Sequence, residues 1–101
     1  MNFQVRRSSE TIEVLLNGRL EFTDHDSLPD IVAVLDDAGP RRFILDMEKL
    51  DFIDSAGIGM LLILQDEAEQ RNAKLILRKL HGDVRRSIDL ARIGELITIE
   101  E

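Results

Sequence analysis

Cysteine, tryptophan and tyrosine are absent from this sequence of 101 residues, and its four aromatic residues are all phenylalanine. Without cysteine, the chain forms no disulfide and has no thiol to use as a nucleophile. With so few aromatic rings, the core must be built mainly from aliphatic side chains. The longest apolar run, Ile58 to Leu64, is interrupted by Gly59 and is far too short to span a bilayer.

Basic residues are also in deficit, because 13 lysines and arginines stand against 20 aspartates and glutamates, a net charge of −7. This balance argues against a nucleic-acid partner, since phosphate contacts require a basic surface. The acidity fits either solubility alone or a basic patch on a partner protein. The first residues, MNFQVRRSSE, lack the pattern of a signal peptide, so we expect a cytoplasmic protein that does not bind membranes.

A chain of this length, with 44% hydrophobic and 33% charged residues, is expected to fold as one soluble domain over residues 1–101. Its first part alternates apolar and polar residues at Phe3–Val5 and again at Ile12–Leu16. This period of two predicts two short strands, which we expect to pair antiparallel.

A helix should follow the acidic loop EFTDHDSLPD. We favour Asp26 over Thr23 as its N-cap, because Pro29 then falls within the first turn, where proline loses no hydrogen bond. Gly39–Pro40 is its predicted end. The apolar stripe of this helix consists of Leu28, Ile31, Val32 and Leu35.

The second half of the chain alternates strands and helices. Asp83 is predicted to cap the last helix, whose Ile88 and Leu90 should face the core. On the longest helix, one side carries Ile58, Leu61, Leu62, Gln65 and Ala68, as the helical spacing predicts. The predicted elements are strands at Arg42–Met47, Lys74–Leu77 and Leu96–Ile99 and helices at Ser55–Arg71 and Val84–Ala91. The order β-β-α-β-α-β-α-β predicts an α/β protein but leaves several topologies open.

The most informative segment is Leu50 to Leu62, which reads LDFIDSAGIGMLL. Asp54 is a good N-cap, because its carboxylate can accept the free N–H groups of a first helical turn. Ser55 then takes the first helical position, on the surface beside the positive end of the helix dipole, where a phosphate can be added and removed. Gly57 and Gly59 each lower helix propensity by about 1 kcal/mol relative to alanine, which indicates close backbone packing or a surface kept low for a partner.

This segment resembles the signature of the STAS domain family, in particular its small bacterial anti-sigma-factor antagonists. The family pattern Asp-Ser-(Ser/Thr/Ala)-Gly-(Leu/Ile)-Gly matches Asp54 to Gly59, and the family's regulatory phosphoacceptor corresponds to Ser55. Asn17 to Glu21 resembles the Gly-x-Leu-Asp element beside the phosphoacceptor, with Glu21 in place of the usual aspartate. Val84 to Ile99 resembles the family's late helix and last strand, so the resemblance covers almost the whole chain.

The resemblance implies the STAS fold, a mixed β-sheet of about five strands with helices packed on it, and a protein that is not an enzyme. Unphosphorylated, it would bind an anti-sigma factor that is a serine kinase of the histidine-kinase-like ATPase fold. Phosphorylation of Ser55 by this kinase would break the complex, and a PP2C-type serine phosphatase would restore it. The implied partner-binding residues are Glu21, Phe22, Thr23, Asp24, Asp54, Ala56, Gly57, Ile58 and Gly59.

Two rival interpretations remain open. A STAS scaffold or regulatory module would use the same face to control a non-sigma output protein. An enzyme with Ser55 as nucleophile would need a histidine base, and only His25 and His81 are available. The segment also lacks the first glycine of the Gly-x-Ser-x-Gly elbow, so the enzyme interpretation is weak.

Cofactor and metal chemistry have little support in the sequence. The pair Gly57 and Gly59 lacks the third glycine of a dinucleotide fingerprint and lies inside a predicted helix rather than before it. Asp24, His25 and Asp26 are adjacent in a loop, and three adjacent residues rarely converge on one ion. We therefore predict no cofactor and no metal. Helix capping and solvation explain the acidic loop better. If the loop borders Ser55, as the family match implies, it could also pair with basic residues of a kinase and repel a phosphate on Ser55.

Overall fold

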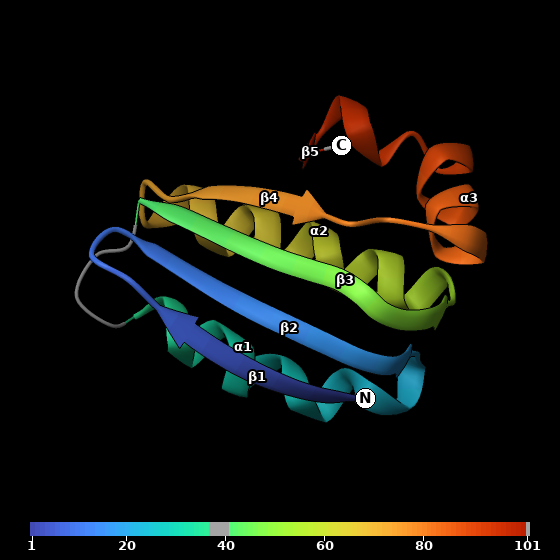
Figure 1. The fold of residues 1–101 in the computed structure, drawn as a ribbon, viewed down its shortest axis with the longest axis horizontal. Coiled ribbons are helices and arrows are strands. Elements are labelled where there is room, and N and C mark those ends of the chain that lie inside the picture. Colours follow the sequence, from blue (N-terminus) through green and yellow to red (C-terminus); the bar gives the residue numbers. More distant parts are fainter. Residues whose placement is uncertain (37–40, 101) are drawn as a thin grey trace.

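The computed structural model describes residues 1–36 and 41–100. One sheet contains five strands in the order β1-β2-β3-β4-β5, with α1 and α2 on one of its faces (Figure 1). The strands are β1 (Asn2–Arg7), β2 (Thr11–Leu20), β3 (Arg42–Ile53), β4 (Lys74–Arg78) and β5 (Thr98–Glu100). The helices are α1 (Leu28–Leu35), α2 (Ser55–Gln70) and α3 (Gly82–Leu90), with two 3-10 helices, η1 (Phe22–Ser27) and η2 (Ile93–Glu95).

The sheet is mixed. β1 pairs antiparallel with β2, whereas β2, β3, β4 and β5 are parallel neighbours joined through α1, α2 and α3. These findings confirm the predicted fold class, the element order and the antiparallel first pair. Because parallel strands end at the same edge of a sheet, the segments that follow β2 and β3 lie close together.

The core is aliphatic, as the composition predicted. Leu45 of β3, Leu61 of α2 and Leu77 of β4 are inaccessible to solvent, and of the four phenylalanines only Phe43 is buried. Truncation of such a leucine to alanine typically costs about 2–5 kcal/mol of stability. Among the described residues, no helix is both long and apolar enough to cross a membrane.

β3 is longer than predicted because its alternation is interrupted twice. Leu45 and Met47 enter the core at the usual spacing, but the next core residues, Leu50 and Ile53, each follow three positions later. The register of β3 against β2 shifts twice over this stretch, as β-bulges require. The predicted end at Met47 was therefore wrong, and the strand continues to Ile53.

α1 begins later than predicted. Its N-cap is Ser27, so the prediction of Asp26 was wrong. The reason is that η1 takes up the six residues before α1 and leaves Pro29 at the second helical position, where it still loses no hydrogen bond. The helix ends at Leu35, and the predicted stop at Gly39–Pro40 lies outside the described residues.

The packed side of α2 differs from the side that the helical spacing marks in the sequence. Leu61 and Ala68 of that side are buried, but Leu62 is 37% exposed. The helix is apolar on more than one side between Ile58 and Leu64, so periodicity alone did not identify its inner face. The buried residues of α2 are Gly57, Met60, Leu61, Leu64 and Ala68.

Two predictions for the last helix were also wrong. α3 begins at Gly82 with His81 as its N-cap, and Asp83 lies in the first turn instead. Ile88 is buried as predicted, whereas Leu90 is 77% exposed, because residues two apart lie on opposite sides of a helix. β5 is shorter than the predicted strand, since η2 precedes it.

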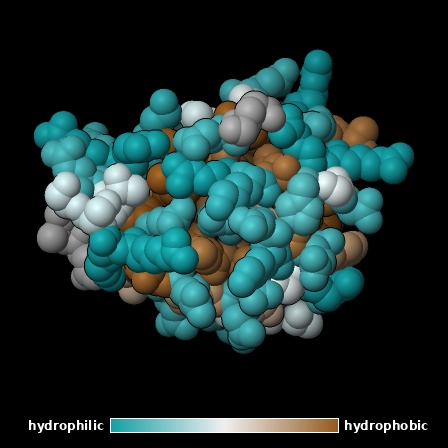
Figure 2. Space-filling view, in the orientation of Figure 1, coloured by the Kyte–Doolittle hydropathy of each residue, from teal (hydrophilic) through white to brown (hydrophobic). Residues whose placement is uncertain are grey.

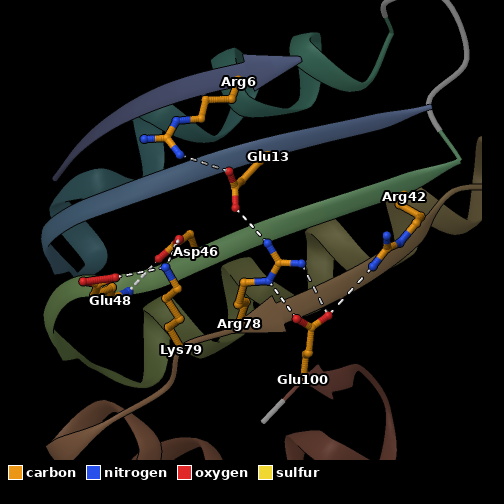
Figure 3. A network of polar contacts seen from close by, with 8 residues as sticks. All are labelled: Arg6, Glu13, Arg42, Asp46, Glu48, Arg78, Lys79 and Glu100. Carbon is orange, nitrogen blue, oxygen red and sulfur yellow. Dashed lines mark hydrogen bonds and ion pairs between the residues drawn. The ribbon is translucent and has the colours of Figure 1, made fainter. Parts of the chain in front are cut away.

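Hydrophilic side chains cover the sheet face opposite α1 and α2, with apolar groups visible between them (Figure 2). Ile44 and Ile76 belong to this open face, yet they are only 2% and 4% exposed. Arg78 donates to Glu13 across β3 at 3.0 Å and to Glu100 of β5 at 2.9 Å (Figure 3). The paired charges therefore shield the isoleucines from water.

Arg78→Ala should lower the free energy of unfolding by about 1–3 kcal/mol, because the Glu13 carboxylate, which is largely buried, loses its short charged hydrogen bond. Arg92→Ala is the control: Arg92 is 77% exposed, and its removal should change stability by less than about 0.5 kcal/mol. Urea unfolding measures both variants. Equal effects would show that the network on the open face adds no stability.

Candidate functional site

The site forms where β3 passes into α2. Asp54 has an extended backbone, with φ −101° and ψ −177°, and its Oδ1 accepts the N–H of Gly57 at 2.7 Å. Its carbonyl oxygen accepts the N–H of Ile58 at 3.0 Å. Asp54 is therefore the N-cap of α2, as predicted, and Ser55 is the first helical residue, with an exposed side chain.

The second carboxylate oxygen of Asp54 reaches a distant part of the sequence. Oδ2 accepts the N–H of Phe22 at 3.2 Å, and the Asp54 N–H donates to the carbonyl of Leu20 at 3.2 Å. These contacts are possible because Leu20 and Ile53, the last residues of β2 and β3, are register partners. The structure thus brings the two motif segments of the sequence together.

Asp24 organises the loop beside Asp54. Its Oδ2 accepts the N–H of Glu21 at 2.8 Å, and its Oδ1 accepts from the ammonium group of Met1 at 2.9 Å. Burial alone would raise the pKa of Asp24, but the bonds from the ammonium group and from Glu21 outweigh it, so the pKa lies below its usual value. Asp24 therefore carries its negative charge in the folded protein at neutral pH.

Arg19, near the end of β2, contacts the start of the same loop. Its Nε donates to Oε1 of Glu21 at 2.6 Å, and its guanidinium lies 4.1 Å from the centre of the Phe52 ring. Cation–π contact and ion pairing together hold the arginine at the end of β2. The carboxylate of Glu21 thus already has a cation beside it within the chain.

The two glycines of the motif occupy different environments. A Cβ atom on Gly57 would lie 2.4 Å from the Leu20 carbonyl oxygen and 2.7 Å from Cγ1 of Ile53, so α2 touches the sheet there. A Cβ atom on Gly59 would meet nothing within 4 Å. Of the two explanations for glycine, close packing therefore applies to Gly57, whereas Gly59 leaves open space on the helix surface.

The residues predicted to bind a partner lie around this junction. Phe22 is 69% exposed, and its ring centre lies 6.4 Å from that of His25, so the loop presents an apolar group to solvent. Phe22 and Thr23 are exposed, Gly57 is buried, and Glu21, Asp24, Asp54, Ala56, Ile58 and Gly59 are half-buried. The arrangement offers a hydroxyl at a helix start, with an apolar side chain and several carboxylates nearby.

Two further apolar residues extend this surface and were not predicted as site residues. Leu62 and Ile63 are 37% and 45% exposed, and they follow Ser55 and Gly59 along the same side of α2. The signal for them was present in the sequence, since the apolar run continues past Gly59. We define Phe22, Ser55, Gly59, Leu62 and Ile63 as the α2 surface.

The ring of His81 links two elements of the fold. Nε2 of His81 lies 2.6 Å from the carbonyl oxygen of Glu48, at the start of α3, so this ring joins the β4–α3 loop to β3. Over residues 1–36 and 41–100, no group of three or more histidine and acidic side chains is placed to hold a metal ion.

A family model of the STAS domain matches residues 2–101, and the chain belongs to this family. A STAS-domain containing protein of Pseudomonas aeruginosa is 29% identical over 93 residues, which cover 89% of this chain and 88% of that protein. A Bordetella bronchiseptica protein named "Putative anti-sigma factor antagonist BtrV" is 30% identical over 76 residues, which cover 75% of this chain and 66% of that protein. The resemblance seen in the sequence is therefore confirmed.

The fold is similar to solved STAS structures. The unphosphorylated form of the anti-sigma factor antagonist SpoIIAA has a TM-score of 0.72 at 22% identity, over 99% of this chain and 88% of that chain. The phosphorylated form of SpoIIAA, a Bacillus cell fate determinant, has a TM-score of 0.68 at 25% identity, over 99% and 92%. The murine anion transporter Slc26a9 gives 0.76 at 22% identity, over 89% of this chain but only 15% of the transporter.

Alanine substitutions should separate the roles of the two glycines. Gly57→Ala should destabilise the protein by about 1–3 kcal/mol, because the new methyl group overlaps backbone and side-chain atoms of the sheet. Gly59→Ala should stabilise it by up to about 1 kcal/mol, because alanine is the better helix former. Chemical denaturation measures both changes. Destabilisation of similar size in both variants would contradict the assignment of close packing to Gly57 and open space to Gly59.

The lowered pKa of Asp24 predicts a dependence of stability on pH. A carboxyl group whose folded pKa lies below its unfolded value contributes stability above the unfolded pKa of about 3.9, and loses it as the pH falls through the folded pKa. Asp24→Asn should therefore be less stable than the parent at pH 7. The difference should shrink steadily as the pH falls below about 4 in urea titrations. A difference that stays constant down to pH 2 would contradict the role of the charge.

Proposed function

We propose that this chain is an anti-sigma-factor antagonist in a cytoplasmic partner-switching circuit. Unphosphorylated, it binds an anti-sigma factor that is also a serine kinase of the histidine-kinase-like ATPase fold. The kinase phosphorylates Ser55 and thereby releases the chain, and a PP2C-type phosphatase reverses the step. The chain itself catalyses no reaction. Membership of the STAS family and the likeness to SpoIIAA in both of its forms support this proposal.

The observation that carries the proposal is the double hydrogen bond of the Asp54 carboxylate, to Gly57 and to Phe22. It fixes the start of α2 and the loop after β2 with one side chain. Ser55 therefore lies on a surface that is already formed before a partner binds. The exposed hydroxyl group of Ser55 is the phosphate acceptor on this surface.

The partner face would combine an apolar centre with acidic edges. The α2 surface supplies the apolar contacts, while Asp54 supplies negative charge and the ion pair of Glu21 with Arg19 lies nearby. Exposed aromatic and aliphatic groups close to charges are typical of protein contact sites. A kinase surface with an apolar pocket and basic residues around it would be complementary to this face.

Phosphorylation would act through charge. A phosphoserine carries about −1.5 to −2 charges at neutral pH. The N-terminus of α2 stabilises an anion by about 0.3–1 kcal/mol, whereas the Asp54 carboxylate repels it, so these effects on the fold nearly cancel. At the interface the phosphate would be desolvated in the apolar pocket of the kinase, away from the basic residues at its edge. A buried charge without a partner costs about 2–5 kcal/mol of binding energy.

A second candidate is a STAS module that regulates a different output protein through the same face. The likeness to part of the transporter Slc26a9 favours this alternative. The matched domain is only 15% of that chain, so a domain of this fold also occurs inside a protein of another kind. The two proposals differ in the identity of the bound partner. Affinity capture from the native lysate, followed by mass spectrometry, distinguishes a sigma-regulating kinase from another output protein.

Incubation with the cognate ATPase-fold kinase and ATP should add one phosphate, and peptide mapping should place it on Ser55. Ser55→Ala should bind the kinase constitutively, because a methyl group removes the acceptor without adding charge. Intact-mass and tandem mass spectrometry check the first result, and co-purification checks the second. Phosphate on any of the other serines, Ser8, Ser9, Ser27 or Ser87, would overturn the assignment.

Gly59→Arg should test the α2 surface directly. A Cβ atom at Gly59 meets nothing within 4 Å, so the arginine side chain starts into open space and the melting temperature should stay close to that of the parent. Kinase binding should weaken by more than about 1 kcal/mol, the size of a typical interface contribution. Gln70→Arg adds the same charge at the far end of α2 and should leave binding unchanged. Equal affinity of both variants would place the partner face elsewhere.

A further inference from the structure

The open face of the sheet contains a hollow with a strongly basic lining. It has a volume of about 370 Å³. It lies beside the β1–β2 turn, the first residues of β3 and the last residue of β4. The cationic and hydroxyl groups around it are Arg6, Arg7, Arg42, Arg78, Ser8 and Thr11. Glu13 and Ile44 complete the lining. Four guanidinium groups around one hollow contrast with the net charge of −7 of the whole chain.

Two carboxylates are shared among three of these arginines (Figure 3). The shortest contacts of Glu13 and Glu100 are with Arg78, at 3.0 Å and 2.9 Å. Arg6 lies 3.7 Å from Glu13, and Arg42 lies 3.8 Å from Glu100, both beyond hydrogen-bond distance. Among these five described side chains, three positive charges face two negative ones, and the outer arginines Arg6 and Arg42 have the longer contacts.

We propose that this hollow binds a small polyvalent oxyanion, a molecule with two or more phosphate or carboxylate groups. Arg6 and Arg42 stand on either side of the central Arg78, and each guanidinium can donate two parallel hydrogen bonds to an oxyanion. The hydroxyl groups of Ser8 and Thr11 supply further donors at the edge. Arg78 remains paired with its carboxylates and fixes the floor of the site.

This site is independent of the surface around Ser55. Thr11 begins β2 and Leu20 ends it, so the hollow and the Asp54 junction lie at opposite ends of that strand, about 30 Å apart along the sheet. Ligand binding at the hollow does not require the proposed partner switching. The Ser55 substitutions should therefore leave it unchanged.

The test is isothermal titration calorimetry of the whole chain at low ionic strength, with inorganic pyrophosphate and citrate as probes. We expect saturable binding that weakens as salt is added. Arg6→Gln and Arg42→Gln should each weaken binding by about tenfold, the effect of losing one charged hydrogen-bonding group. Arg92→Gln is the matched control, since Arg92 is similarly exposed and similarly paired, at 3.6 Å from Glu95, and should change affinity by less than about twofold.

The two probes also separate the possible ligands. Tighter binding of pyrophosphate identifies a phosphate-bearing ligand, and tighter binding of citrate a carboxylate-bearing one. Circular dichroism of each variant checks that the fold is kept. Heats that never saturate, or an equal loss of affinity in all three variants, would overturn the proposal, because only overall charge would then matter.

Discussion

One carboxylate joins the two segments that form the candidate site. Asp54 caps α2 at the N–H of Gly57 with one oxygen and holds the N–H of Phe22, 32 residues earlier in the chain, with the other. It can do both because β2 and β3 are parallel neighbours that end at the same edge of the sheet. The position of Ser55 and that of the apolar loop therefore depend on the same side chain.

Packing makes this arrangement rigid. The two bulges of β3 turn Ile53 into the core directly before Asp54, and Gly57 lets α2 approach the backbone of Leu20 more closely than any other residue would allow. Gly59, one turn from Ser55, has open space above it and so keeps the outer side of the helix low. A group added to Ser55 therefore changes the charge of a surface whose shape is already set.

The sequence predicted those features that depend on near neighbours in the chain. The cap at Asp54 and the position of Ser55 could be predicted because helix capping involves residues within one turn. The outer side of α2 could not be predicted, because Leu62 is as apolar as the residues that pack inward. The contact between Glu13 and Arg78 joins residues 65 apart and leaves no periodic signal, so the open face and its basic hollow emerged only from the fold. The second half of β3 could not be predicted for a similar reason. Its β-bulges interrupt the alternation, and their extra residues are defined only by pairing with the partner strand.

The central claim is that phosphorylation of Ser55 switches binding through charge on a preformed surface. The most direct measurement compares the unmodified and the Ser55-phosphorylated protein for both melting temperature and affinity for the cognate kinase. The account predicts a stability within about 1 kcal/mol of the unmodified form, with an affinity lowered by about a hundredfold or more. A large loss of structure on phosphorylation, or an affinity that stays unchanged, would contradict it.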